Sequence, residues 1–316
     1  MYYLGIDLGG TFIKAGIVDE NGGIIRKDSI ETELPKGVDH VVERMGEISL
    51  KVIADAGLKV SDIGYAGVAA PGQADNQKGI MIYCSSIPFL NYPLAERISA
   101  LTGIKKVYIE NDANAAAKGE SAVGEAKGYK NSIMITIGTG IGGGFIIDGK
   151  LYAGFNFAAA EVGHMVIDHN GPECQCGRKG CWEKLASATA LIKTAREEMA
   201  NHPDSVMWKI CKNNLSEVNA KTPFDAKRQG DAAGTKVVDR FTCYLALGLT
   251  NLINLLQPEI ITIGGGVSNE GDYLLDGVRK IVEKEQYSRH GEHKTKILKA
   301  ALGNDAGIIG AAMLGK

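Results

Sequence analysis

Short apolar stretches separated by glycine-rich turns open the chain and return in its middle. Residues 1–7 and 12–19 predict two strands joined by a tight glycine turn. Residues 132–151 show the same order of strand, glycine turn and strand. A supersecondary unit that occurs twice in one chain indicates two related α/β lobes.

Helical spacing of apolar residues alternates with these strands. Residues 39–57 carry apolar side chains at intervals of three and four and end at Gly57, a common helix stop. The same reasoning predicts helices over residues 93–102, 112–122, 186–199, 241–257 and from about 272, strands over residues 63–70, 105–110 and 259–263, a surface loop over residues 85–94 and a small-residue helix over residues 304–314. Strands that alternate with helices predict an α/β fold.

We expect the two lobes to meet near residue 118, within or just after the alanine-rich helix. The N-terminal lobe would span residues 1–118, with a C-terminal helix of residues 305–316 packing back on it. The larger lobe would span residues 119–304. No Gly/Ser-rich or Pro-rich linker separates the two.

Charge and composition exclude several classes of protein. With 35 Lys and Arg against 37 Asp and Glu, and a pI near 6.3, the chain offers no basic field for nucleic acid or a membrane surface. No apolar run is long enough to span a bilayer, and the first residues lack the pattern of a signal peptide. Six cysteines, three of them clustered, suit a reducing compartment, so we expect a cytoplasmic protein.

A cluster of metal-ligating residues lies in a loop near the middle of the chain. His164, Cys174, Cys176 and Cys181 offer one nitrogen and three sulfurs, the ligand set of a tetrahedral structural Zn²⁺. The spacing is not that of the common zinc fingers, and His169 is a rival nitrogen ligand. Buried thiols or a redox pair are the alternatives that the residues leave open. A disulfide is less favoured, because nothing indicates export.

Three glycine turns invite a nucleotide-binding interpretation. Gly138, Gly140 and Gly143 fit G-x-G-x-x-G, but a strand follows them where the dinucleotide fingerprint requires a helix. A glycine turn between strands still presents converging N–H groups to an anion, and the repeated unit supplies two such turns. The third turn, residues 264–266, permits close approach of a flat ligand such as adenine, although a sharp turn alone would also need glycine.

Asp112 stands where a predicted strand ends and a helix begins. One interpretation is a helix N-cap, a common role of Asp. The other is a functional carboxylate, because α/β sheets place ligands at the C-terminal ends of their strands. The positive end of the helix dipole would favour the ionised form of such a carboxylate. The two interpretations are compatible.

A series of motifs, in order along nearly the whole chain, gives the sequence a specific resemblance. They read DLGGT at residues 7–11, APG at 70–72, NDAN at 111–114, ITIGTGIGGG at 135–144, EVGH at 161–164, CQCGRKGCWE at 174–183 and IGGG at 263–266. The glycine motifs are individually weak, whereas EVGH joined to C-x-C-G-x-x-G-C-x-E is highly specific. On these motifs the chain resembles the ROK family (repressors, uncharacterised frames and sugar kinases), and within it the glucokinases.

The resemblance implies an actin-like, ribonuclease-H-like α/β fold with two lobes around a central cleft. It implies transfer of the ATP γ-phosphate to a hexose, first of all glucose to give glucose 6-phosphate, with ATP, Mg²⁺ and structural Zn²⁺ as cofactors. Asp112 would be the general base, and His164 with the three clustered cysteines would bind the zinc. The implied sugar-binding positions are Asn111, Glu161, His164, Glu183, Gly72 and Ser86. The implied nucleotide-binding positions are Asp7, Gly9, Gly10, Thr11, Lys14, Gly138, Thr139, Gly140, Gly265 and Gly266. Family likeness suggests a homodimer or homotetramer.

Three positions depart from the family pattern. Phe12 stands where many members carry Lys, Ala69 where a Gly often precedes the x-P-G turn, and Ser86 where glucokinases usually have Asn. The resemblance implies that the Ser86 loop helps to recognise the sugar, so allose, mannose, N-acetylmannosamine, fructose or another hexose stays open as the substrate. The preferred phosphoryl donor also stays open.

Two alternatives to a kinase belong to other classes. A sugar-sensing repressor of the same family carries a helix-turn-helix ahead of the DLGGT strand. This chain starts at that strand, so we expect no DNA-binding domain. A non-catalytic sugar or nucleotide binder is the second alternative, and the pairing of Asp112 with Asn111 argues against it.

Overall fold

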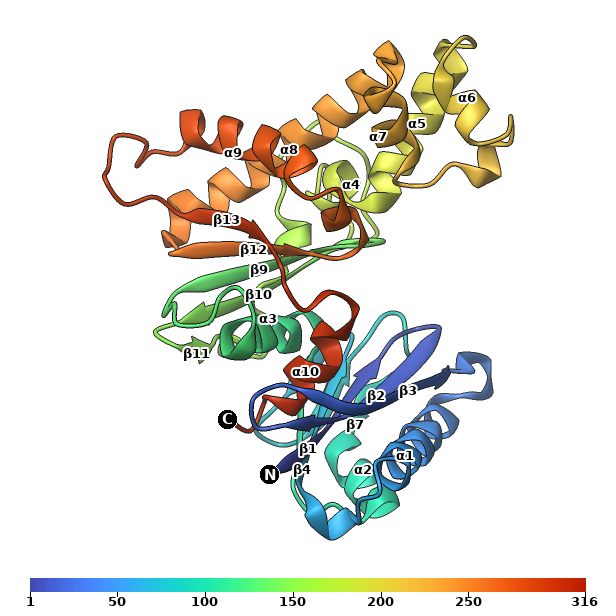
Figure 1. Ribbon diagram of the computed structural model, residues 1–316, viewed down its shortest axis with the longest axis vertical. Coiled ribbons are helices and arrows are strands. Elements are labelled where there is room, and N and C mark those ends of the chain that lie inside the picture. The colour runs from blue at the N-terminus through green and yellow to red at the C-terminus, as the bar shows by residue number, and fades with distance from the viewer. The chain divides into compact units, whose positions relative to one another are not determined.

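The computed structural model describes residues 1–316 and forms two compact units (Figure 1). Unit 1 comprises Met1–Met134, Gly144–Ala160 and Ala300–Lys316. Unit 2 comprises Ile135–Gly143 and Glu161–Lys299. Residue 118, where the sequence places the lobe boundary, lies inside helix α3 (Asp112–Val123), and α3 stays whole in unit 1.

Unit 1 is built on a five-stranded mixed sheet. Its order is β3-β2-β1-β4-β8, with the bounds β1 (Tyr2–Leu8), β2 (Phe12–Asp19), β3 (Ile24–Glu31), β4 (Ile63–Ala70) and β8 (Val107–Asn111). The first three strands are antiparallel, because short turns join them, whereas β1, β4 and β8 run parallel and need long connections. The C-terminal ends of β1, β4 and β8 therefore share one edge of the sheet.

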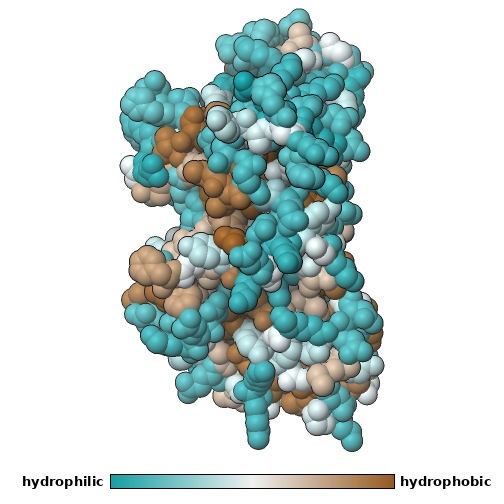
Figure 2. All heavy atoms as spheres, turned by 90° about the vertical axis from the view of Figure 1, so that its left-hand side faces the viewer, coloured by the Kyte–Doolittle hydropathy of each residue, from teal (hydrophilic) through white to brown (hydrophobic).

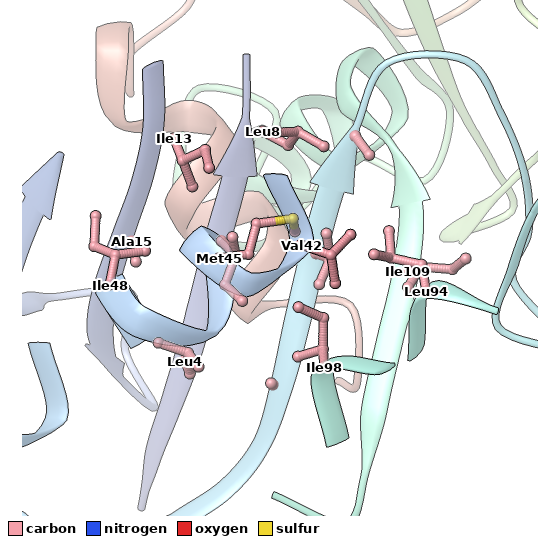
Figure 3. Packing of buried hydrophobic residues seen from close by; sticks show 14 of the residues in the cluster. Leu4, Leu8, Ile13, Ala15, Val42, Met45, Ile48, Leu94, Ile98 and Ile109 are labelled. Atoms are coloured by element: carbon pink, nitrogen blue, oxygen red, sulfur yellow. The ribbon is translucent and has the colours of Figure 1, made fainter. Parts of the chain in front are cut away.

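Helices α1 (Val38–Asp55) and α2 (Leu94–Thr102) cover one face of this sheet. Figure 3 shows their apolar side chains lying over those of the strands, and these residues include Val42, Met45, Ile48, Leu94 and Ile98 from the helices and Leu4, Leu8, Ile13, Ala15 and Ile109 from the sheet. The three-and-four spacing in α1 puts its apolar residues on that single face. Gly103, with φ 78°, ends α2 in the left-handed region.

The other face of the sheet is covered by α10 (Ala306–Ala312), which comes from the far end of the chain. Alternation along the strands puts Tyr3 on this face and Leu4 on the opposite one. The backbone of α10 lies so close to the sheet that a Cβ at Gly67 would clash with the carbonyl oxygen of Ala311. Glycine in the strand therefore permits the close approach of this helix.

A small antiparallel sheet follows β4. It consists of β5 (Gln73–Asp75), β6 (Ile80–Tyr83) and β7 (Leu90–Tyr92). The prediction of an irregular surface loop over residues 85–94 is therefore wrong for Leu90–Tyr92. Ile87 and Phe89 in the same segment are buried in the core. A strand of three residues is too short to show alternation in the sequence, and only its pairing with β6 defines it.

The second five-stranded sheet repeats the plan of the first. Its order is β11-β10-β9-β12-β13, with the bounds β9 (Ser132–Ile137), β10 (Ile141–Ile147), β11 (Lys150–Leu151), β12 (Ile260–Gly264) and β13 (Lys296–Lys299). The last two strands are parallel, as β4 and β8 are. The repeat that the sequence predicts from its two strand, turn, strand units is confirmed.

The helices of unit 2 follow β11 and β12. Their bounds are α4 (Glu183–Ala186), α5 (Ala188–Asn201), α6 (Val206–Ile210), α7 (Thr222–Arg228), α8 (Ala232–Leu256) and α9 (Asp272–Glu285). Helix α8 begins well before residue 241, where the sequence predicts its start, because the Asp231 side chain caps it by accepting from the backbone N of Gly234 at 2.7 Å. Short 3₁₀ turns span Leu34–Lys36, Val60–Asp62, Val162–His164, Leu215–Glu217, Gly266–Glu270 and Gly303–Asp305.

The surface is largely polar. Hydrophilic residues cover most of the face shown in Figure 2, and hydrophobic residues form smaller patches between them. None of the helices combines the length and the apolarity that crossing a bilayer demands.

Candidate active site and metal centre

The turn from β8 into α3 carries a connected set of polar groups in unit 1. Asn111 is the N-cap of α3, since its Oδ1 accepts from the backbone N of Ala113 at 2.9 Å and of Asn114 at 3.2 Å. The interpretation of Asp112 as the N-cap is therefore wrong. A β-region cap residue turns its side chain toward the next N–H groups, and Asn111 takes that position because the strand ends one residue before α3 begins.

The Asn111 side chain is also bound from its other side. Its Nδ2 donates to the carbonyl oxygen of Gly72 at 3.0 Å, and Gly72 adopts φ 102° in the turn between β4 and β5. An amide nitrogen carries two hydrogens, so one of them is left for an external acceptor such as a sugar hydroxyl. The structure thus brings together two of the expected sugar-binding positions, Asn111 and Gly72.

Asp112 is the first residue of α3 and is exposed. Its Oδ1 accepts from the backbone N of Ala113 at 2.9 Å. The N-terminal end of α3 favours the ionised form of this carboxylate. Ser86, another expected sugar-binding residue, is exposed on the loop between β6 and β7, where its Oγ lies 3.3 Å from the Sγ of Cys84.

The first glycine turn connects β1 to β2 next to a half-buried carboxylate. Gly9 donates its N–H to the carbonyl oxygen of Phe12 at 3.0 Å, which closes the turn, and Gly10 and Thr11 at its tip are exposed. Asp7 precedes the turn and pairs with the Nζ of Lys14 at 3.3 Å. Burial raises the pKa of the Asp7 carboxyl, and the charge of Lys14 opposes that rise.

The cysteine cluster in unit 2 forms as the sequence predicts. One ligand atom each from His164, Cys174, Cys176 and Cys181 lies within 4.8 Å of every other. The Nδ1 of His164 lies 3.6 Å from the Sγ of Cys174, and the Sγ atoms of Cys176 and Cys181 are 3.5 Å apart. All three cysteines are free thiols. His169 does not belong to the cluster, so the rival nitrogen ligand is set aside.

Backbone hydrogen bonds hold the loop that carries these ligands. Ile167 donates its N–H to the carbonyl oxygen of Gly180 at 3.0 Å, and Trp182 donates to Met165 at 2.8 Å. Gly180 adopts φ 70°, and a Cβ there would clash with the carbonyl oxygen of Asp168, so only glycine fits. Burial raises the pKa of the Cys181 thiol to about 12, so a bound cation would have to displace its proton.

The metal loop, our name for residues 164–181 with the proposed zinc ligands, and the second glycine turn at residues 138–140 meet at Glu183. Its Oε1 accepts from the Sγ of Cys174 at 3.4 Å, and its Oε2 lies where a Cβ at Gly140 would point. Glu161 is the N-cap residue of the 3₁₀ turn that contains His164, and it is exposed. Within unit 2 the structure therefore gathers the cluster, one carboxylate and one glycine turn.

The remaining glycines differ in how tightly they are packed. The carbonyl oxygen of Gly138 accepts from the N of Ala188, and that of Thr139 accepts from the Oγ1 of Thr189, so the second turn is tied to helix α5. Gly265 has φ 83°, and a Cβ there would clash with the backbone of Ile137, so the fold itself requires this glycine. No atom lies within 4 Å of a Cβ on Gly266, so the packing does not explain that glycine.

One residue of the site was missed by sequence reasoning. Glu110 is 2% exposed and accepts hydrogen bonds from Asn76, Asn111 and Asn114. Burial raises the pKa of its carboxyl, and these hydrogen bonds oppose the rise. A charged residue as the next-to-last residue of an apolar strand is the signal that could have found it, because a buried carboxylate must be paired.

Comparison with known proteins gives a consistent result. A family model described as "ROK family" matches residues 3–316. Glucokinase of Thermotoga maritima is 38% identical over 313 residues, which are 98% of this chain and 96% of that protein. The crystal structure of a ROK family glucokinase from Streptomyces griseus, in complex with glucose and AMPPNP, matches with a TM-score of 0.85 at 33% identity and covers 99% of each chain.

A relative of another kind matches as well. The xylose repressor of Bacillus subtilis is 29% identical over 99% of this chain, which spans 76% of that protein. The structural match confirms the expected α/β fold of the actin-like class.

Proposed function

The chain belongs to the ROK family, and we propose that it is an ATP-dependent hexose kinase, with glucose the first candidate substrate. Glucokinases match it over nearly its full length, which supports both the reaction and the sugar. Phosphoryl transfer asks a protein chiefly for positioning and for neutralisation of charge. The glycine turns and the carboxylates of the two units are groups of that kind.

The observation that carries the proposal is the Asp112 carboxylate at the N-terminus of α3. It is exposed, and the capped turn beside it holds its backbone in place. In the mechanism that we propose, Asp112 takes the proton of the sugar hydroxyl as that oxygen attacks the γ-phosphorus of ATP. The bond from this phosphorus to the bridging oxygen breaks, and ADP leaves.

The sugar and the nucleotide would be bound by separate sets of residues. Sugar hydroxyls need paired donors and acceptors, and each pair that an epimer leaves unmade costs about 1–3 kcal/mol. We assign this role to Asn111, Gly72, Ser86, Glu161, His164 and Glu183. The turns at residues 9–11 and 138–140 would donate N–H groups other than those of Gly9 and Gly138, which close the turns, to phosphate oxygens, and Gly265 and Gly266 would lie at the adenosine.

Two metal ions enter the proposal with different roles. The donor set of one imidazole nitrogen and three thiols fits Zn²⁺, and four protein ligands leave no open position for a substrate. Zinc would therefore be structural and would fix the loop that ends at Cys181, two residues before Glu183. Asp7 is the carboxylate that would face the Mg²⁺ of the nucleotide, which supplies positive charge to the phosphates, and Lys14 would add to that charge.

The choice of sugar is tested with a substrate panel. Purified protein is assayed with Mg·ATP and glucose, allose, mannose, fructose or N-acetylmannosamine, and kcat/KM is compared by coupled detection of ADP. We expect glucose to give the highest value. A higher kcat/KM for another hexose would change the assigned substrate but not the assigned reaction. If no sugar of the panel led to release of ADP, the kinase assignment would be refuted.

The general base is tested by Asp112→Asn. We expect kcat to fall by about 10²–10⁴-fold while sugar binding, measured by calorimetry, survives. Asp204→Asn is the matched control, because Asp204 is exposed in a loop of unit 2 outside the proposed site. Turnover of the Asp112 variant at the wild-type rate would refute the role of this residue.

A sugar-responsive regulator is the second candidate, since the xylose repressor matches the same residues. It predicts that sugar binds with a measurable Kd while ADP is not released at any concentration of ATP. The substrate panel and the calorimetry together separate the two candidates.

A further inference from the structure

Glu110 is the buried charged residue closest in sequence to the proposed base. Its Oε1 accepts from the backbone N of Asn111 at 2.9 Å and from the Nδ2 of Asn114 at 3.1 Å, and its Oε2 accepts from the Nδ2 of Asn76 at 2.7 Å. The side chain is 2% exposed. Burying a carboxylate is costly unless each oxygen finds a donor, and here both oxygens do.

The donors belong to two different segments. Asn111 and Asn114 flank Asp112 on both sides, whereas Asn76 lies in the turn between β5 and β6, beyond Gly72. The Asn111 side chain returns to the same region, because its Nδ2 binds the Gly72 carbonyl. The residues around Asp112 are thus tied to the segment after β4 by two connections, one from Asn111 to Gly72 and one through Glu110 to Asn76 in the β5–β6 turn.

We propose that Glu110 is a positioning residue that fixes the Asp112 carboxylate by binding the residues before and after it and fastening them to the β5–β6 turn. The inference rests on the proposed role of Asp112 as the base. Glu110 touches no substrate in this scheme. It acts through the backbone of Asn111 and the start of α3.

The geometry explains why a glutamate stands at this place. A carboxylate accepts hydrogen bonds through both oxygens and brings no donor that would need a partner of its own. Asn111 already caps α3, so Glu110 is not needed as the cap. Its hydrogen bonds instead restrict the direction of the helix start, where a misplacement on the order of 1 Å costs about 10²-fold in rate.

Two conservative variants separate position from charge. Glu110→Asp keeps the charge but draws the carboxylate back by one methylene, so it cannot reach both Asn111 and Asn76. Glu110→Gln keeps the length and an oxygen for Asn111 and Asn114, and the exposed Asn76 amide can rotate to accept from its NH₂ group. We expect kcat to fall about 10–100-fold in Glu110→Asp, as loss of one or two such hydrogen bonds would give, and about threefold or less in Glu110→Gln.

The readout is kcat, taken as the maximal rate divided by the concentration of sugar-binding sites, which is measured by calorimetric titration. Unfolded protein then does not lower the value. KM for ATP should stay unchanged in both variants, because the proposed nucleotide residues are elsewhere. Val42→Ala, on the buried face of α1, is the control for lost stability, and it should lower Tm without lowering kcat per site. Equal wild-type kcat in Glu110→Asp and Glu110→Gln would overturn the proposal.

The double variant Glu110→Asp with Asp112→Asn decides whether the two residues act together. If Glu110 acts through Asp112, adding Glu110→Asp to the Asp112→Asn variant should lower kcat by no more than about threefold. A loss of kcat in the double variant equal to the product of the two single-variant losses would overturn the inference about Glu110 and leave Asp112 as the base. Wild-type turnover in Asp112→Asn alone would refute the base, and the inference with it.

Discussion

The metal loop of unit 2 gives the sharpest prediction about stability. Cys176→Ser removes one of the four proposed zinc ligands, and Cys176 is exposed, so replacing its sulfur by oxygen disturbs no packing. We expect the variant to lose its zinc and part of its thermal stability. The loss of zinc follows because a hydroxyl is a poor ligand for Zn²⁺ in a site built from thiolates.

The size of the effect follows from the length of chain that the ligands close. His164 and Cys181 are 17 residues apart, and a cross-link over about 15 residues stabilises a fold by about 3 kcal/mol. The hydrogen bonds from Ile167 to Gly180 and from Trp182 to Met165 survive the substitution, so the loop loosens without unfolding. For a unit of this size about 3 kcal/mol corresponds to a fall in Tm of about 6–12 °C.

The assay combines metal analysis with calorimetry. Wild-type protein should carry about one zinc per chain, as a single cluster of four ligands would bind, and Tm should fall when a strong chelator removes it. Cys243→Ser is the matched control, because Cys243 is an exposed thiol of the same unit that lies outside the cluster. It should keep both the zinc and the Tm.

Two outcomes would contradict this reasoning. Wild-type protein that is free of zinc and has the same Tm with and without chelator would show that the cluster is a set of thiols. A Cys176 variant that keeps its zinc would show that the exposed cysteine is not a ligand.

Two further predictions concern unit 1. Gly67→Ala should destabilise the fold by about 1–3 kcal/mol in denaturant unfolding, because its Cβ would clash with the Ala311 carbonyl of α10. Gly10→Ala is the control, because no atom lies within 4 Å of a Cβ at that position, and it should change stability by no more than about 0.5 kcal/mol. Equal losses in the two variants would contradict the close approach of α10. The difference in Tm between Glu110→Gln and the wild type should shift in favour of the variant as pH rises. Burial raises the folded-state pKa of Glu110 above its ordinary value of 4.5, so the wild type loses stability as pH rises from 4.5 through the folded pKa. A Tm difference that does not change with pH would contradict burial of the ionised carboxylate.

Much of the fold could be read from the sequence because its longer elements carry strong periodic patterns. Helix α1 and strands β1, β2, β4 and β9 form where apolar spacing predicts them. The actin-like class, the repeat of the strand, turn, strand unit and membership of the ROK family were predicted and are confirmed. The predicted cluster of one histidine and three cysteines also assembles. It could be predicted because four ligands that lie close in the sequence restrict the loop to few conformations.

Other features are decided by contacts between residues far apart in the sequence. Strand β7 is defined by its pairing with β6, and the position of α10 by the glycines of β1 and β4 that it touches. Asn111, and not Asp112, is the N-cap of α3, because the register of β8 beside β4 sets where the strand ends.

The sequence alone determined the longer helices and strands and the cluster of one histidine and three cysteines, since propensity, spacing and motif are local properties of the chain. Only the tertiary structure decided that Glu110 is buried among three asparagines and that Asn111 has one amide hydrogen left to offer. Burial and hydrogen-bond partners depend on neighbours brought in from distant segments, and no local pattern encodes them.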